Sequence, residues 1–297
     1  MKIIDISVYT FDKANAPVCT ADAGETLLFK PMDCFSNQML SEDMQMAEVF
    51  RTVPSNPAAG PVFINGAEPG DVLVVEILDI QVAEEGTVGT SETCGPLAKT
   101  TVPRVKKIPL RDGFAEFNGI RFPIDPMIGV IGTAPAGEGV RCFLPGPHGG
   151  NMDSKIIRKG AKLYLPVRVP GALLQMGDIH ATMGDAELCG TGIEVPGEIT
   201  VKTALIKNFP LSVPVTETDS HWWVNACAAE YDEALQLASE ELSRLLMDVT
   251  GWDKTDTYMY MSIRCDVQIN QACKPCSAPM VLRFGAPKFH DDKPLIG

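Results

Sequence analysis

Short runs of alternating apolar and polar residues, separated by glycine and proline, recur along this chain and constrain it to a β-rich fold. The clearest run is Asp71–Ile80, which is entered through a Glu-Pro-Gly turn at Glu68–Gly70. A period of two places successive side chains on opposite faces of a strand, whereas a helix needs a period of about 3.6. We predict strands with this character over Met1–Tyr9, Lys106–Leu110, Gly113–Phe117, Ile120–Phe122, Met127–Gly132, Lys162–Val169, Gly190–Val195, Ile199–Ile206 and Met259–Ile269.

One segment has the periodicity of a helix. It begins at Asp232, which we predict as the N-cap, and continues to Val249 with leucine and alanine at intervals of three and four; Gly251 follows as a stop. The short apolar segment Ala172–Met176 fits either a strand or one turn of helix. With many strands and one helix, the sequence predicts an α+β, β-rich fold of two packed β-sheets with few helices.

Composition and charge narrow the function classes. The chain has 297 residues, 45% of them hydrophobic, and can therefore bury an ample core. Its net charge of -13 would repel nucleic acids and anionic membranes, so we expect neither as a partner. Neither a signal-peptide pattern nor a membrane-spanning apolar run occurs, which predicts a cytoplasmic protein. No linker stands out, so we expect one domain over residues 1–297, divisible into sub-lobes of about 1–140 and 141–297.

The nine cysteines indicate reduced thiols, because their number is odd and their positions are irregular. Cys273-Lys-Pro-Cys276 has the spacing of a redox pair or of half a zinc knuckle, but no second such pair occurs in the sequence. Its role stays open. Cys34, Cys142 and Cys189 lie near the candidate site described next, where we expect pocket-lining thiols in preference to nucleophiles.

Polar and catalytic residue types are concentrated between Gly146 and Glu194. This segment holds two of the four histidines, His148 and His180, among carboxylates and glycines. His180 lies two residues after Asp178 and seven before Glu187. In an extended segment the side chains of Asp178 and His180 face the same way, and such a carboxylate fixes the histidine tautomer or shares a metal with it. We interpret the segment as an active site.

Several of these residues also have a structural interpretation. The pair Gly149-Gly150 allows Asp153 to turn sharply into a cleft, although an Asx-turn would use the same residue types. His148 either lines the pocket or lies in a surface loop, and Glu194 either supports the site or ends a strand. Motifs for a serine nucleophile elbow, a zinc-protease helix or a phosphate loop do not occur in the sequence, which favours hydrolysis by a carboxylate and histidine cluster, with or without metal.

Several motifs, in order from about Asp33 to Ile269, resemble those of the acetamidase/formamidase family. The motifs are Met-Asp33-Cys34-Phe, Asn56-Pro-Ala-Ala-Gly60-Pro61, Gly66-Ala-Glu-Pro-Gly70-Asp71, Met127-Ile-Gly-Val-Ile-Gly132, Gly149-Gly-Asn-Met-Asp153, Leu163-Tyr-Leu-Pro-Val167, Gly177-Asp-Ile-His180 and Gly192-Ile-Glu194. The resemblance implies hydrolysis of the carbon-nitrogen bond of a small linear amide to ammonia and a short carboxylate. It also implies a β/α/β sandwich, a homo-oligomer and a divalent ion, often zinc. The matching acidic and histidine positions are Asp33, Asp153, His180 and Glu187.

An assignment of roles follows from what an amide requires, namely a polarised carbonyl and a protonated leaving nitrogen. We assign His180, Asp153 and Asp33 as metal ligands, with zinc preferred and calcium as the alternative. Glu187 is the expected general base, which takes a proton from water and passes it to nitrogen. We also assign Asp178 a catalytic role, because its carboxylate is expected to lie beside His180.

Asn151 and His148 are the expected substrate-binding residues; His148 is also an alternative metal ligand. Two positions depart from the family pattern, because Ile179 and Ala186 stand where many relatives have glycine in Gly-Asp-Gly motifs. Both changes are expected to add bulk beside the site and to affect substrate size. Two further function classes remain open: hydrolysis of a cyclic amide (a lactam) by the same fold, and a non-enzymatic binding protein whose acidic cluster holds structural calcium.

Overall fold

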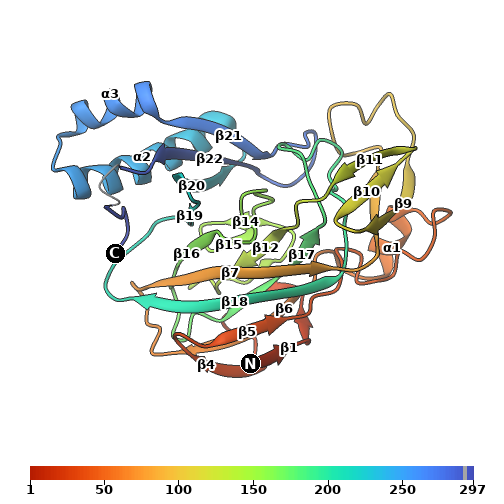
Figure 1. Cartoon of the computed structure of the whole chain (residues 1–297), viewed down its shortest axis with the longest axis horizontal. Helices are drawn as coiled ribbons and strands as arrows, with labels where there is room; N and C mark the ends of the chain where they lie inside the picture. Colours follow the sequence, from red (N-terminus) through yellow and green to blue (C-terminus); the bar gives the residue numbers. More distant parts are fainter. Residues whose placement is uncertain (290–292) are drawn as a thin grey trace.

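The computed structural model describes residues 1–289 and 293–297, and in this part of the chain it shows a mostly β fold with three helices (Figure 1). Most strands belong to two large sheets, one of nine strands and one of seven. Across the nine-stranded sheet the order is β1 (Lys2–Ile4), β5 (Thr26–Phe29), β18 (Gly197–Ile206), β7 (Val72–Val82), β16 (Lys162–Pro166), β19 (Val215–Glu217), β20 (His221–Ala228), β22 (Met280–Pro287) and β21 (Asp266–Gln271).

The seven-stranded sheet carries much of the candidate site. Its members are β14 (Pro145–Gly146), β15 (Gly149–Asn151), β12 (Met127–Gly132), β17 (Leu174–His180), β6 (Ala58–Asn65) and β2 (Ser7–Val8), with β4 (Cys19–Asp22) paired to β6. The four-stranded sheet consists of β8 (Glu85–Thr90), β9 (Arg104–Arg111), β10 (Phe114–Phe117) and β11 (Ile120–Pro123), and β3 (Thr10–Phe11) pairs with β13 (Val140–Arg141).

The two large sheets pack directly on one another through the main hydrophobic core. On β7, Leu73, Val75 and Ile77 point into this core, where they join Ile128 and Met176 of the seven-stranded sheet. The alternation seen in the sequence is therefore the alternation between the two faces of β7. The β-rich, two-sheet fold class is confirmed.

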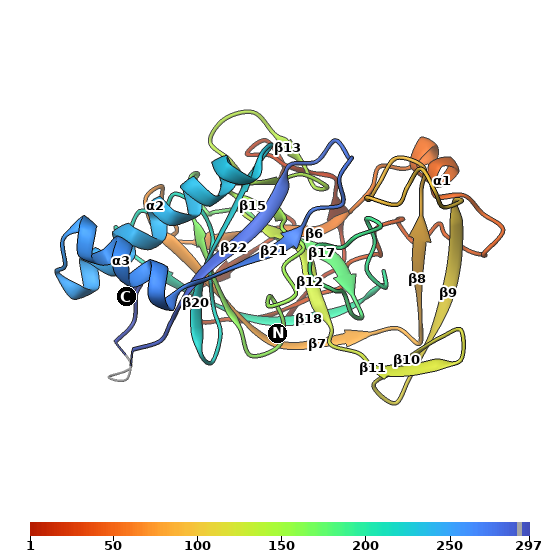
Figure 2. The same ribbon diagram turned by 90° about the horizontal axis from the view of Figure 1, so that it is seen from above.

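The two long helices cover the other face of the nine-stranded sheet. Helices α2 (Tyr231–Thr250) and α3 (Lys254–Arg264) lie together over β20 and β22, at the end opposite α1 (Met46–Thr52) and the four-stranded sheet (Figures 1 and 2). Val72 and Val74, the alternate residues of β7, share a second core with Leu242 and Leu246 of α2. Helix α2 ends at Gly251, whose φ of 73° is the left-handed C-cap expected of glycine.

The prediction of a strand over Met259–Ile269 was wrong for most of its length. This segment contains the second half of α3, and β21 begins only at Asp266. Helix α3 begins at Lys254, because the Asp253 side chain caps it by accepting hydrogen bonds from the backbone N–H groups of Thr255 and Asp256, both at 2.9 Å. The N-cap of α2 was also misplaced, since that position is occupied by Glu230 and not by Asp232.

The predicted strand Gly190–Val195 is an irregular segment with isolated bridges at Glu194, which pairs with Thr87 and with His180. Conversely, β6, β20 and β22 were not predicted as strands, because both of their faces are largely buried and alternation is lost. Of the two readings left open for Ala172–Met176, the strand is observed from Leu174, where β17 begins. Over residues 1–289 and 293–297, no helix combines the length and apolar character needed to cross a bilayer.

Candidate active site

A cavity of about 550 Å³ opens above the polar cluster predicted from the sequence. Its wall includes Asn151, Asp178, Glu187 and Glu194. Asp153 and His180 lie behind this wall, where each side chain is only 1% exposed. The structure therefore brings together acidic and histidine residues from separate parts of the chain, at a place that a small molecule can approach.

The His180 imidazole is surrounded by carboxylates. Its Nε2 lies 3.2 Å from Glu194 Oε2, 3.7 Å from Asp178 Oδ1 and 3.9 Å from Asp153 Oδ1. Within the described residues, none of these three oxygens has a hydrogen-bond partner. Buried carboxylate oxygens without a partner are costly, so their gathering around one imidazole nitrogen marks a site for a proton or a cation.

The second oxygen of each of these carboxylates is held by an N–H donor. The Asn56 side chain donates to Asp178 Oδ2 at 2.7 Å, and the backbone of Gly192 donates to Glu194 Oε1 at 2.8 Å. The Gln271 side chain donates to Asp153 Oδ2. One oxygen of each carboxylate is thus oriented by the protein, which leaves the other oriented toward His180.

Gln271 is the residue that the sequence reasoning missed. It lies at the end of β21, and its Nε2 also donates to Glu187 Oε2 at 2.9 Å. The side-chain ligand atoms of Asp153, His180 and Glu187 all lie within 4.8 Å of one another, and a second group with the same spacing is Cys34, Asp178 and Glu194. A glutamine 84 residues from Glu187 leaves no local signal in the sequence.

Three of the acidic residues have left-handed backbone. The φ values are 42° for Asp153, 56° for Asp178 and 45° for Glu187. This region is uncommon for residues other than glycine and is found where surrounding structure imposes it, often at functional sites. The local conformation that directs these carboxylates inward is therefore maintained by the packing of the surrounding strands and loops.

The electrostatics favour a positive partner for the cluster. Burial, together with Glu187 and Asp178, raises the pKa of Asp153. Burial also raises the pKa of Glu187, and it raises that of Glu194 to about 8. Burial alone would lower the pKa of His180, but the carboxylates of Glu194 and Asp178 raise it well above its ordinary value. Without a cation, the cluster retains protons.

The donor set fits a divalent metal. Ligands about 2.0–2.1 Å from a tetrahedral zinc ion are roughly 3.4 Å apart, close to the separations of Glu194, Asp178 and Asp153 from His180 Nε2. The imidazole favours zinc or a related transition metal over calcium, which prefers oxygen ligands only.

Two residues assigned from the sequence are placed elsewhere. The Asp33 carboxylate closes a turn, accepting from the backbone N–H groups of Phe35 at 3.0 Å and Asn37 at 2.6 Å, and it is absent from the ligand groups of the described residues. The buried His148 ring packs edge-on against Phe11 at 4.8 Å and does not line the cavity. Asn151 does line it, and its Oδ1 has no partner in the described part of the chain.

Comparison with known proteins decides the family. Residues 13–138 and 136–282 match the sequence profile of the Acetamidase/Formamidase family. The chain belongs to the acetamidase/formamidase family. The crystal structure of an acetamidase from Bacillus halodurans superposes with a TM-score of 0.91 at 35% identity, covering 96% of this chain and 97% of the other.

Two curated relatives agree with this membership. A putative formamidase of Schizosaccharomyces pombe is 33% identical over 254 residues, which are 63% of this chain and 61% of the relative. A formamidase of Methylophilus methylotrophus is 30% identical over 210 residues, 50% of this chain and 51% of the relative. The matched region thus spans between half and two thirds of these relatives.

The expectation that Ile179 adds bulk beside the site was wrong. Ile179 does not add bulk beside the site, because its side chain lies in the main core while its neighbours Asp178 and His180 point the other way. Ala186 does not line the cavity either.

Gly129 of β12 is expected to be intolerant of a side chain. A Cβ at this position would lie 2.6 Å from Asp153 Oδ1 and 2.7 Å from Asp178 Oδ2. We expect Gly129→Ala to displace both carboxylates and to lower kcat/KM roughly 100-fold, because small misplacements of reacting groups have effects of this size. Gly184→Ala is the matched control, since its Cβ would meet nothing within 4 Å. Equal activity of the two variants would contradict this arrangement.

His148 is expected to make the protein less stable in acid. Burial lowers its pKa from 6.5 to about 4, so between these values the unfolded chain binds a proton that the folded chain excludes. Stability should fall as the pH decreases through this window, by about 3 kcal/mol in total. We expect His148→Gln to remove this contribution, measured as a smaller difference in unfolding free energy between pH 6.5 and pH 4. An unchanged difference would show that His148 is protonated in the folded state.

Proposed function

We propose that this protein hydrolyses the carbon-nitrogen bond of small linear amides of the formamide and acetamide type, releasing ammonia and a short carboxylate. The observation that carries the proposal is the group of three buried carboxylate oxygens that face His180 Nε2 and have no hydrogen-bond partner in the described residues, next to an open cavity. Membership of the acetamidase/formamidase family and the names of the relatives support the same reaction.

We assign substrate binding to the cavity wall above the cluster. Asn151 places a side-chain amide there, which can accept from the substrate N–H and donate to its carbonyl. Met46, Phe50 and Phe143 contribute apolar surface that suits a short acyl group. The volume of about 550 Å³ exceeds what formamide requires, so amides with longer acyl groups belong in any substrate test.

A divalent cation, preferably zinc, would be held by His180 and Asp153, with ligand oxygens also available from Asp178 and Glu194. When bound, it would supply Lewis-acid polarisation of the carbonyl and would lower the pKa of a water molecule. We leave Asp33 out of this proposed ligand set, because it belongs to no ligand group of the described residues and its Oδ1 closes a turn.

Glu187 is the proton carrier of the proposed mechanism. As a carboxylate it accepts a proton from the attacking water, and as a carboxylic acid it donates that proton to the leaving nitrogen. The pKa raised by burial favours the second step, because a weaker acid holds its proton until nitrogen becomes basic. Gln271 fixes the position of Glu187 through the 2.9 Å hydrogen bond. Asp178 acts through its contact with His180, whose position it helps to define.

Product analysis of the purified protein tests the proposal and its two alternatives. Formamide, acetamide and propionamide should release ammonia, whereas a lactam opens to an amino acid without ammonia. We expect ammonia from the linear amides and little lactam opening. Lactam opening alone would favour the cyclic-amide alternative, and a calcium-stabilised protein inactive on both classes would favour the binding protein.

A further inference from the structure

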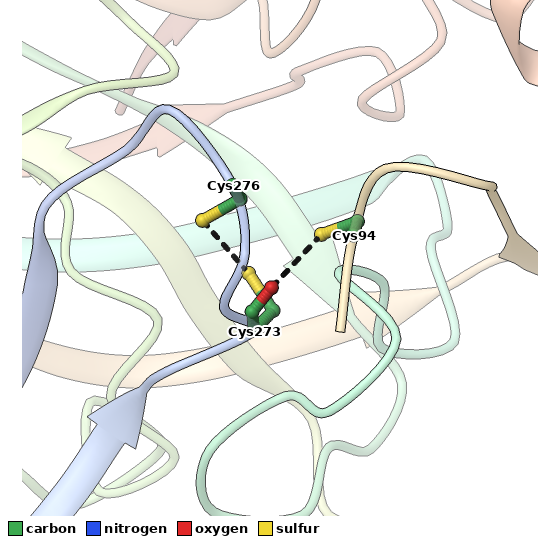
Figure 3. Close-up of side chains that lie close together, drawn as sticks. All are labelled: Cys94, Cys273 and Cys276. Carbon is green, nitrogen blue, oxygen red and sulfur yellow. Dashed lines mark hydrogen bonds between the residues drawn. The ribbon is translucent and has the colours of Figure 1, made fainter. Parts of the chain in front are cut away.

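Three cysteines form a cluster separate from the His180 site. Cys94 comes from the loop between β8 and β9, and Cys273 and Cys276 come from the loop between β21 and β22. Figure 3 shows the three side chains directed toward one another across the two loops. Their sulfur atoms all lie within 4.8 Å of one another, and the Cys273 and Cys276 sulfurs are 3.6 Å apart. All three residues line the cavity above the acidic cluster.

The surrounding loops hold the third cysteine in place. The backbone N–H of Gly95 donates to the carbonyl of Cys273 at 2.6 Å, and the Cys94 sulfur lies 3.6 Å from the same oxygen. A Cβ at Gly190 would lie 2.3 Å from the Cys94 sulfur. Because residue 190 is a glycine, there is room for the Cys94 side chain. The cluster is therefore built by three loops that are distant in sequence.

The spacing fits one metal ion bound by three thiolates. With Zn–S bonds of about 2.3 Å, sulfurs in a tetrahedral site are roughly 3.75 Å apart, close to the separation of Cys273 and Cys276. The two-residue spacing of these cysteines lets one loop supply two ligands to the same ion. A disulfide would use only two of the three sulfurs and would leave Cys94 without a role.

We propose that Cys94, Cys273 and Cys276 bind a zinc ion as three thiolates, with the fourth coordination position facing the cavity. Binding converts three thiols to thiolates and releases three protons, so the divalent ion with its ligands carries one net negative charge. The ion ties the loop that contains Cys94 to the loop of Cys273 and Cys276, and thereby fixes one wall of the cavity. This site shares no ligand with the His180 cluster.

Cobalt titration of the reduced, chelator-treated protein tests the proposal, because thiolate-bound cobalt has a charge-transfer absorption that carboxylate- and imidazole-bound cobalt lacks. We expect one equivalent of cobalt to bind with the charge-transfer absorption of three thiolates. Zinc should displace this cobalt and abolish the absorption. Cys94→Ser and Cys276→Ser should each weaken this charge-transfer absorption. Cys265→Ser, a cysteine outside the cluster, and His180→Ala should leave the absorption unchanged. Retention in His180→Ala separates this site from the proposed amidase centre, so either idea can fail alone.

Alkylation of the unmodified protein provides a test that requires no variant. Zinc should slow the reaction of Cys94, Cys273 and Cys276 at least about tenfold, while the other six cysteines react as before. Absence of the charge-transfer absorption would overturn the proposal. The proposal would also be overturned if the charge-transfer absorption were lost in Cys34→Ser and kept in Cys94→Ser. The thiolate bound to cobalt would then be Cys34, beside the acidic cluster.

Discussion

Replacing Glu187 with glutamine is expected to lower kcat on acetamide or formamide by about 10²–10⁴-fold, the usual contribution of a general acid-base group. Glutamine keeps the size of the side chain and can still accept the hydrogen bond from Gln271, but it cannot take a proton from water. Steady-state ammonia release measures the effect. Metal analysis of the same sample should show unchanged content, because Glu187 is assigned to proton transfer.

Glu198→Gln is the matched control for that substitution. Glu198 lies on β18 and forms a half-exposed ion pair with Lys30 at 2.6 Å, so its loss should leave kcat within about twofold. If Glu187→Gln retained activity similar to that of this control, the proton carrier would have to be another residue. If it lost metal together with activity, Glu187 would be a metal ligand.

Removal of metal is expected to make stability strongly dependent on pH. In the metal-free protein, burial raises the pKa of Glu194 from 4.5 to about 8, so the folded state holds a proton that the unfolded state releases. This contribution is fully present below pH 4.5 and is lost as the pH rises through about 8. The raised pKa of His180 acts in the same direction. We expect the chelator-treated protein to lose on the order of a few kcal/mol of stability across this window.

Thermal unfolding at pH 5 and pH 8, with and without added zinc, measures this effect. Zinc should restore stability chiefly at pH 8, because the cation replaces the protons that the carboxylates have lost. Glu194→Gln should flatten the pH dependence of the metal-free protein. A metal-free protein that became more stable between pH 5 and pH 8 would contradict the proton-retaining cluster.

Much of the fold could be predicted from local patterns. Strands that have one buried face and one partly exposed face, such as β9 and the second half of β7, show the alternation that identifies them. Helix α2 shows its apolar stripe and its terminal glycine. The errors have two different causes. The strand predicted over the second half of α3 overlooked the local Asp253 cap, whereas β17 is buried along its whole length and therefore shows no alternation.

The sequence by itself determined the segment in which most of the candidate site lies, because Asp153, Asp178, His180 and Glu187 stand close together along the chain among turn-forming glycines. Only the tertiary structure decided which distant side chains complete it. Gln271 reaches Asp153 across 118 residues, and Cys94 reaches Cys273 across 179.

Contacts of this kind depend on strand register and on the packing of loops, neither of which has a periodic signature in the sequence. Asp33 differs from these residues, because the contacts of its Oδ1 are local ones within a turn and it belongs to no ligand group of the described residues. Residue types and local spacing thus indicate the chemistry, whereas long-range packing selects which of those residues share a site.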